Sequence, residues 1–234
     1  QPVQGELLPE IYGGRYDRLL RRYVGEPKHI AELTATEQQV EALQKALYGD
    51  QSELILLGAP GSGKTSFLLL WAILVSLIRP NTTGGLTAPT NDRRMIVWKD
   101  AIQMLEPLDW IEKHGVRRVD KEIRLKNGVI WEVIATKAPS KEMGSPIQGR
   151  SWSWAGKDEM QSIDADAHVQ IATRGRRAGD SYRMVGTATN QIHLASWRMY
   201  LERAKQSPRH YVHRMAGQAN AFTDLQYWED LRHQ

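Results

Sequence analysis

Apolar and polar positions along the central part of the chain recur with spacings that predict strands and helices in alternation. The apolar run Leu54–Leu57 predicts a buried strand, and the largely apolar stretch Ser66–Ile78 is long enough for a helix. Apolar residues also recur at helical spacing over Thr36–Leu47 and Asp92–Leu108. The second of these segments contains Met95–Asp100, which resembles a magnesium-binding strand. Its helical period continues, however, so we expect a helix there.

Turn-forming residues divide the rest of the chain into further elements. Asn127 and Gly128 lie between Glu122–Leu125 and Val129–Ile134, a pattern typical of a β-hairpin. Residues 80–85 are expected to form a loop before a short strand at 86–90. The other expected elements are the strands Ser151–Lys157, Tyr182–Gly186 and His210–Met215 and the helices Asp164–Thr173 and Ser196–Ala204. This alternation predicts an α/β fold with a mainly parallel central sheet and helices on both faces.

The segment between the first of these strands and its helix carries the clearest chemical motif of the chain. It fits the phosphate-binding pattern G-x-x-x-x-G-K-[ST] and consists of Gly58, Ala59, Pro60, Gly61, Ser62, Gly63, Lys64 and Thr65, with Ser66 next. In this pattern, glycines allow backbone N–H groups to surround phosphate oxygens, and the helix N-terminus adds a positive dipole. The lysine binds the β- and γ-phosphates, while the threonine hydroxyl binds Mg²⁺. The sequence therefore predicts a P-loop nucleoside triphosphatase.

Hydrolysis of a bound nucleotide also needs a carboxylate near the metal and a group that orients the attacking water. Asp158 and Glu159, at the expected end of a strand, suit these roles, with Asp158 at the metal and Glu159 at the water. The preceding segment is more polar than a central parallel strand usually is, and Lys157 next to the acid is unusual. From their expected contacts with the attacking water and the phosphates, we expect Glu159 and Lys64 to be catalytic.

The composition narrows the remaining chemistry. The sequence has no cysteine, which excludes disulfides and thiolate metal sites, and its seven histidines lack ligand spacing. The longest apolar run is too short to span a bilayer, so we expect no membrane partner. The net charge of +4 is mildly basic, with arginines clustered at residues 15–22 and 174–177. Solvated surface charge and binding to a polyanion both account for these clusters.

Several segments, in their order along the chain, resemble the ATPase domain of the large terminase subunit, the DNA-packaging motor of tailed bacteriophages. They are the phosphate loop, Thr87–Thr90 with the helix after it, the hairpin around Lys126–Gly128, Ile147–Arg150, the acid pair, and Gly186–Asn190. The resemblance covers residues 33–220, and its specificity lies mainly in the order of the motifs. It implies a RecA-like (ASCE) P-loop fold and an ATPase that uses ATP and Mg²⁺.

The resemblance also implies roles for residues outside the phosphate loop. The segment from Thr187 to Asn190 would be the coupling motif, which senses the γ-phosphate and relays hydrolysis to DNA movement. Either Gln38 or Gln39, on the first predicted helix, would read the edge of the adenine.

A further implied residue is the arginine that completes a neighbouring subunit's active site. The family often has an arginine just before a loop glycine, whereas here Gln148 precedes Gly149 and Arg150 follows it. The arginine that acts on a neighbour would therefore be Arg150, or else one of the clustered residues Arg174, Arg176 and Arg177.

The resemblance implies double-stranded DNA as a partner, together with further copies of the chain in a ring at a capsid portal and the small terminase subunit. Such a protein would work in the cytoplasm of the infected host cell and transiently at the viral procapsid. Residues 1–32 would form an N-terminal arm, and residues 221–234 would begin a linker toward a nuclease domain that is absent here. We therefore expect no nuclease activity.

Two other functions suit parts of the same pattern. Helicase-type ATPases share the glutamine-bearing helix, the phosphate loop, an acid pair and a Ser/Thr-Ala-Thr motif, although Asp158–Gln161 is not a usual helicase acid box. A regulatory or assembly module that binds ATP as a switch would keep nucleotide binding but have very slow turnover.

Overall fold

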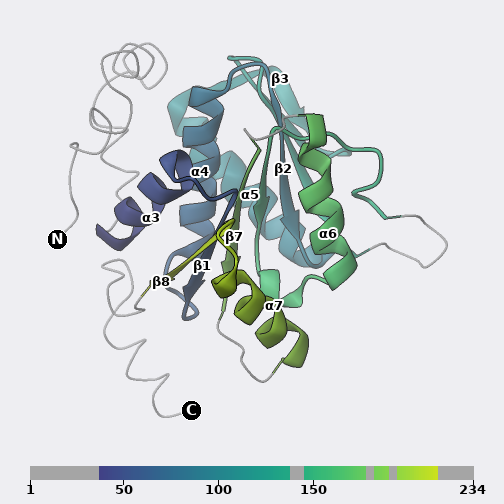
Figure 1. The fold of residues 1–234 in the computed structure, drawn as a ribbon. Coiled ribbons are helices and arrows are strands. Elements are labelled where there is room, and N and C mark those ends of the chain that lie inside the picture. Colours follow the sequence, from purple (N-terminus) through teal and green to yellow (C-terminus); the bar gives the residue numbers. More distant parts are fainter. Residues whose placement is uncertain (1–36, 138–144, 178–181, 190–193, 216–234) are drawn as a thin grey trace.

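The computed structural model describes residues 37–137, 145–177, 182–189 and 194–215, and one sheet runs through them (Figure 1). Its strands are β1 (Glu53–Gly58), β2 (Thr83–Ala88), β3 (Ile111–Arg117), β4 (Glu122–Leu125), β5 (Ile130–Ala135), β6 (Trp154–Lys157), β7 (Arg183–Ala188) and β8 (His210–Met215). The strand order is β3-β4-β5-β2-β6-β7-β1-β8. Strands β5, β2, β6, β7, β1 and β8 are parallel, whereas β4 pairs antiparallel with β5, and β3 pairs antiparallel with β4. The predicted α/β fold with a mainly parallel sheet is confirmed, and so is the hairpin.

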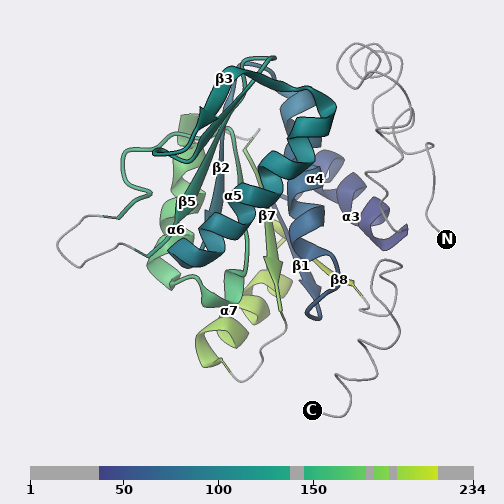
Figure 2. The same cartoon turned by 180° about the vertical axis from the view of Figure 1, so that it is seen from behind.

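Helices cover both faces of this sheet. They are α3 (Glu37–Tyr48), α4 (Lys64–Ile78), α5 (Asn91–Leu105), α6 (Ala165–Thr173) and α7 (Ala195–Gln206), with short 3₁₀ turns η1 (Glu106–Leu108), η2 (Met160–Ser162) and η3 (Arg174–Arg177). Helices α4 and α5 lie on one face, and α6 and α7 lie on the other, as the opposite views in Figures 1 and 2 show. Among the described helices, none is both long and apolar enough to cross a membrane. The predicted arm (1–32) and linker (221–234) lie outside the described residues.

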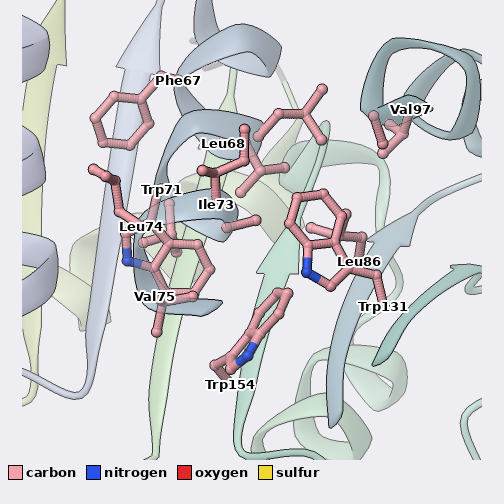
Figure 3. Close-up of a cluster of buried hydrophobic side chains, with 14 of the residues drawn as sticks. Phe67, Leu68, Trp71, Ile73, Leu74, Val75, Leu86, Val97, Trp131 and Trp154 are labelled. Carbon is pink, nitrogen blue, oxygen red and sulfur yellow. The ribbon is translucent and has the colours of Figure 1, made fainter. Parts of the chain in front are cut away.

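Helix α4 is the centre of the larger hydrophobic core. It is apolar on nearly all sides and buried along most of its length, as expected for a helix enclosed by a sheet and neighbouring helices. Its Trp71 meets Trp154 of β6 edge to face, with ring centroids 5.7 Å apart, and Trp131 of β5 packs on the same Trp154 at 5.9 Å (Figure 3). The indoles therefore join three elements of the core.

Strand β2 begins at Thr83, so the prediction of a loop over residues 80–85 is wrong at its end. The cause lies in two glycines that normally signal a turn. A Cβ at Gly84 would lie 2.0 Å from the Trp154 ring, and one at Gly85 would lie 2.5 Å from the Trp152 ring. The glycines are in the strand because the large indoles of the neighbouring chain segment occupy the space of their side chains.

Three other strands differ from the sequence prediction. Strand β3 was not expected, because it is an edge strand whose residues are mostly exposed and polar, without the alternation of a half-buried strand. Strand β6 is shorter than predicted and starts at Trp154. Strand β7 is longer and runs on to Ala188, so Thr187 lies within the strand rather than after it. The indoles of Trp152 and Trp154 are buried, as core packing requires.

The unusual Lys157 forms a buried ion pair with Glu53 at the start of β1. The side chains of Lys157 and Glu53 are only 1% and 3% exposed. Glu53 Oε2 also accepts a hydrogen bond from Tyr200 of α7 at 3.2 Å and lies 3.3 Å from Nε2 of His210 in β8. Lys157 is tolerated in β6 because Glu53, its buried partner on the nearby strand β1, neutralises its charge.

The pKa of Glu53 reflects this pairing. Burial alone would raise it, but the charge of Lys157 and the contacts with Lys157 and His210 lower it from 4.5 to about 2. Because the folded-state pKa is below the ordinary value, the ionised carboxylate stabilises the fold above about pH 4.5. That contribution is lost as the pH falls toward 2.

Substituting Glu53→Gln should destabilise the fold strongly, because it leaves the Lys157 ammonium buried without a counter-ion. We expect the free energy of unfolding at pH 7, measured by urea denaturation, to fall by about 3–5 kcal/mol. The control is Glu202→Gln, which breaks an exposed pair with Lys205 and should change the same quantity by less than about 1 kcal/mol. Equal effects of the two substitutions would contradict the assigned importance of the buried pair.

Candidate active site

The phosphate loop lies between the carboxyl end of β1 and the first turn of α4. Gly61 and Gly63 have φ angles of 71° and 77°, in the left-handed region that glycine adopts readily. A Cβ at Gly58 would lie 2.4 Å from Ser62 Oγ, so the loop closes too tightly for a side chain there. The start of α4 has no side-chain cap and no acidic residue in its first turn. Its backbone amides are therefore suited to an anionic ligand.

Lys64 is folded against this loop. Its Nζ donates hydrogen bonds to the carbonyl oxygens of Gly58 at 3.0 Å and Ala59 at 2.6 Å. Burial lowers the pKa of Lys64, while the nearby carboxylates of Glu159 and Asp158 act in the opposite direction. The ammonium is thus held within the loop, where the sequence motif requires a cation for phosphate.

Asp158 follows the last residue of β6 and joins the loop to two other strands. Its Oδ1 accepts hydrogen bonds from the hydroxyls of Thr65 at 3.1 Å and Thr187 at 3.0 Å. Its backbone N–H donates to the carbonyl of Thr87 at 2.8 Å. Because β2, β6 and β7 are parallel neighbours, their carboxyl ends meet at one edge of the sheet, and the carboxylate lies there beside the start of α4.

Glu159 stands next to Asp158 in a left-handed backbone conformation, with φ 50°. Its Oε2 accepts a hydrogen bond from Gln161 Nε2, and Gln161 Oε1 accepts one from the backbone N–H of Thr189 at 3.2 Å. The side chain is about one quarter exposed, which leaves it open to solvent. Gln161 therefore connects the expected water-orienting carboxylate to the residue after β7.

Sequence reasoning missed Arg93, which contacts both acids. Its guanidinium Nη2 lies 3.1 Å from Asp158 Oδ2 and 3.0 Å from Glu159 Oε1. Arg93 is in the first turn of α5, which Thr90 caps by accepting a hydrogen bond from the Arg93 N–H at 3.3 Å. The contact follows from the sheet order, which the sequence pattern does not give: α5 follows β2, and β2 pairs in parallel with β6, so the start of α5 lies near the end of β6.

The residues at this edge fit a magnesium ion bound with a nucleotide. The Thr65 hydroxyl and an Asp158 carboxylate oxygen are hard oxygen donors that lie 3.1 Å apart beside the phosphate loop. Mg²⁺ in nucleotide sites is usually held by one or two such protein groups together with phosphate oxygens and water. Thr65 and Asp158 would hold the metal, and the loop with Lys64 would hold the phosphates.

The structure brings one of the two candidate glutamines to the loop. Gln39 of α3 is buried, and its Nε2 donates to the carbonyl of Gly63 at 3.4 Å. The side chain of Gln38 and the whole of Asn190 lie outside the described residues. Ser66 is exposed in the first turn of α4. The roles suggested for these residues in nucleotide binding stay predictions.

Arg150 lies apart from this chain's own acid pair. It precedes β6 by four residues, whereas Asp158 follows directly after that strand, so the two are at opposite ends of β6. Its Nη1 donates to Glu132 Oε1 at 2.6 Å, and its side chain is 42% exposed. Arg174 donates from Nε to the carbonyl of Gln170 at 3.2 Å. The side chains of Arg176 and Arg177 lie outside the described residues.

Thr187→Val should weaken binding of a magnesium–nucleotide complex, because it removes one of the two hydroxyl donors that orient Asp158. We expect about a tenfold loss of affinity, the scale of one hydrogen bond to a charged group, measured by titration with a fluorescent nucleotide. The matched control is Thr87→Val, since Thr87 is equally buried at the end of β2 but donates to the Gly156 carbonyl instead. Equal losses in both variants would show that Thr187 acts only through packing.

The sequence matches no known family or curated protein, whereas the structure matches several solved proteins. No protein-family model matches the sequence, and no curated protein matches it. Among solved structures, the large terminase of the thermophilic bacteriophage D6E matches with TM-score 0.69 and 16% identity, covering 84% of this chain and 49% of that chain. The Thermus phage P74-26 large terminase ATPase domain matches with TM-score 0.56 and 14% identity, covering 82% of this chain and 84% of that chain.

A helicase also resembles the fold. The DUF1998 helicase MrfA, solved bound to DNA, matches with TM-score 0.52 and 14% identity, covering 93% of this chain and 31% of that chain. This chain spans about half the length of the D6E terminase, but most of the isolated P74-26 ATPase domain. The described part of the chain has the fold of large terminase ATPase domains.

Proposed function

We propose that this chain is an ATP-hydrolysing motor domain that moves double-stranded DNA during viral genome packaging. The observation that carries the proposal is the convergence of Lys64, Thr65, Asp158 and Glu159 at one edge of a sheet with this fold. Support also comes from the D6E large terminase, which has been solved in complex with ADP and with ATP-gamma-S.

Each residue has a separate part in the proposed hydrolysis. The loop amides and Lys64 bind and orient the phosphates, and Thr65 with Asp158 binds Mg²⁺. Mg²⁺ held there would supply positive charge against the phosphate oxygens. Glu159, open to solvent beside Asp158, orients the attacking water and accepts its proton. The hydrogen bond from Thr187 to Asp158 connects the metal ligand to β7, whose following segment would couple hydrolysis to movement.

The motor would act as a ring of identical subunits around DNA at a capsid portal, together with the small terminase subunit, in the infected host cell. Arg150 supports this assembly, because it is exposed and lies at the end of β6 opposite the acid pair. An exposed arginine away from its own acid pair is available to a neighbouring subunit's site. Arginines supplied by a neighbour raise the rate of phosphoryl transfer by about 10³–10⁵.

Glu159→Gln should abolish most turnover while leaving nucleotide binding intact, because the amide cannot accept a proton from water. We expect kcat for ATP to fall by about 10²–10⁴, measured as phosphate release with and without double-stranded DNA. Lys64→Ala provides the contrast, since it should remove binding of ATP itself. Undiminished turnover in the Glu159→Gln protein would overturn the assigned role.

Mixing inactive variants tests whether Arg150 acts on a neighbour. Arg150→Ala and Glu159→Gln subunits are each expected to be nearly inactive alone. In an equal mixture, activity should recover to about one quarter of the wild-type value, because random assembly pairs the two intact residues at that share of head-to-tail interfaces. Arg174→Ala is the control, and it should be active alone. If Arg174→Ala is instead inactive alone and recovers in its mixture with Glu159→Gln, while the Arg150→Ala mixture does not recover, the role passes to Arg174.

The second candidate function is a helicase-type ATPase, favoured by the match to MrfA. A strand-separation assay distinguishes the two functions. A translocase on duplex DNA hydrolyses ATP in the presence of intact duplex without releasing a labelled strand, whereas a helicase releases it. Binding to duplex DNA should also weaken with salt. For each tenfold rise in salt concentration, log K should fall by about 0.9 for every phosphate contacted.

A further inference from the structure

Arg93 bridges the two acids that the proposed site uses for a metal ion and an attacking water. Its Nη2 is within hydrogen-bond distance of Asp158 Oδ2 and Glu159 Oε1 at the same time. The Asp158 side chain is 2% exposed, so its carboxylate has little access to solvent, whereas the Arg93 side chain is 34% exposed. The guanidinium therefore covers the carboxylate from the solvent side of the site.

The remaining oxygens of the acid pair already have donors. Asp158 Oδ1 accepts from Thr65 and Thr187, and Glu159 Oε2 accepts from Gln161. Each of the four carboxylate oxygens is thus engaged, and the described cation that contacts both acids is Arg93. A dication held by Thr65 and Asp158 Oδ1 would lie close to the guanidinium bound to Oδ2 of the same carboxylate. Coulomb repulsion between cations a few ångströms apart, in a partly buried site, makes each weaken the binding of the other.

The side chain of Arg93 can move away from the acids without a change in the fold. It stands in the first turn of α5, where only its backbone N–H is fixed by the Thr90 cap. Its long side chain can rotate about several bonds without moving the helix. The positive charges of Arg93 and Lys64 repel each other, which contributes to the lowered pKa of Lys64. An anion bound in the loop would therefore attract a displaced guanidinium as well as Lys64.

We propose that Arg93 is a displaceable counter-ion of the acid pair. It pairs with the carboxylates of Asp158 and Glu159 in the nucleotide-free protein, and a magnesium–nucleotide complex displaces it. The proposal rests on the proposed ATPase function for its role in the cycle. In that cycle, Arg93 is a positioning residue that keeps free divalent metal out of the site until the phosphates arrive. The nucleotide brings enough negative charge to draw the guanidinium away and to admit the metal.

The test uses metal alone and nucleotide-free protein. Binding of Mn²⁺, in place of Mg²⁺, is measured by the loss of the free-ion electron paramagnetic resonance signal. Arg93→Ala should bind Mn²⁺ at least about tenfold more tightly than the wild-type protein, because the competing cation is gone. The matched control is Arg94→Ala, the next residue of α5, for which no ion pair is found among the described residues. It should bind Mn²⁺ as the wild-type protein does.

A purely structural role for Arg93 predicts no gain of metal affinity at the acid pair when it is removed, so a gain that depends on Asp158 separates displacement from a structural role. Arg93→Lys keeps a positive charge but loses the planar guanidinium, and its Mn²⁺ affinity should lie between those of the wild-type protein and Arg93→Ala. Asp158→Asn in the Arg93→Ala background should remove the gained affinity, which shows that the metal binds at the acid pair. Unchanged or weaker Mn²⁺ binding by a folded Arg93→Ala protein would overturn the proposal.

The outcome is distinguishable from failure of the proposed function. If the wild-type protein does not hydrolyse ATP but Arg93→Ala binds Mn²⁺ more tightly, the proposed ATPase fails and the counter-ion role of Arg93 stands. If ATP is hydrolysed and Arg93→Ala leaves Mn²⁺ binding unchanged, the ATPase stands and the counter-ion role fails.

Discussion

The hydrogen bond between Thr65 and Asp158 is the interaction on which the candidate site depends. It connects the first turn of α4, which belongs to the phosphate loop, with the end of β6, which carries the acid pair. These residues are 93 positions apart in the chain, and only the parallel order of the central strands brings them together. The second hydroxyl on the same carboxylate oxygen, from Thr187, extends the connection to β7. One carboxylate thus ties the nucleotide-binding loop to two strands of the sheet.

The sequence indicated the local parts of this candidate site, because each depends on a short-range pattern. The phosphate loop is recognisable from eight consecutive residues, and two of its glycines, Gly61 and Gly63, adopt left-handed conformations. The acid pair could be located because it ends a strand, even though Lys157 made that strand look too polar. The roles of Gln39, Arg150 and the segment after β7 were suggested only by family resemblance.

What the sequence could not provide were interactions between segments that are distant in the chain. The pairing of Lys157 with Glu53 gives no periodic signal, and neither does the reach of Arg93 to the acids from the start of α5. Gly84 and Gly85 were misread because a glycine pair usually marks a turn, whereas here the indoles of Trp152 and Trp154, just before and at the start of β6, occupy their side-chain space. Edge strand β3 was missed since an exposed strand need not alternate apolar and polar residues.

The buried pair of Lys157 and Glu53 restricts how this sequence can diverge. Replacing either residue alone leaves a charge without its partner in the interior, whereas exchanging both for apolar residues of similar volume is tolerated far better. Position 157 adjoins Asp158, the proposed metal ligand, and position 53 opens the strand that leads to the phosphate loop. The two positions should therefore vary together among homologues. A homologue with an aliphatic residue before its acid pair should lack the acidic residue at the start of its first strand.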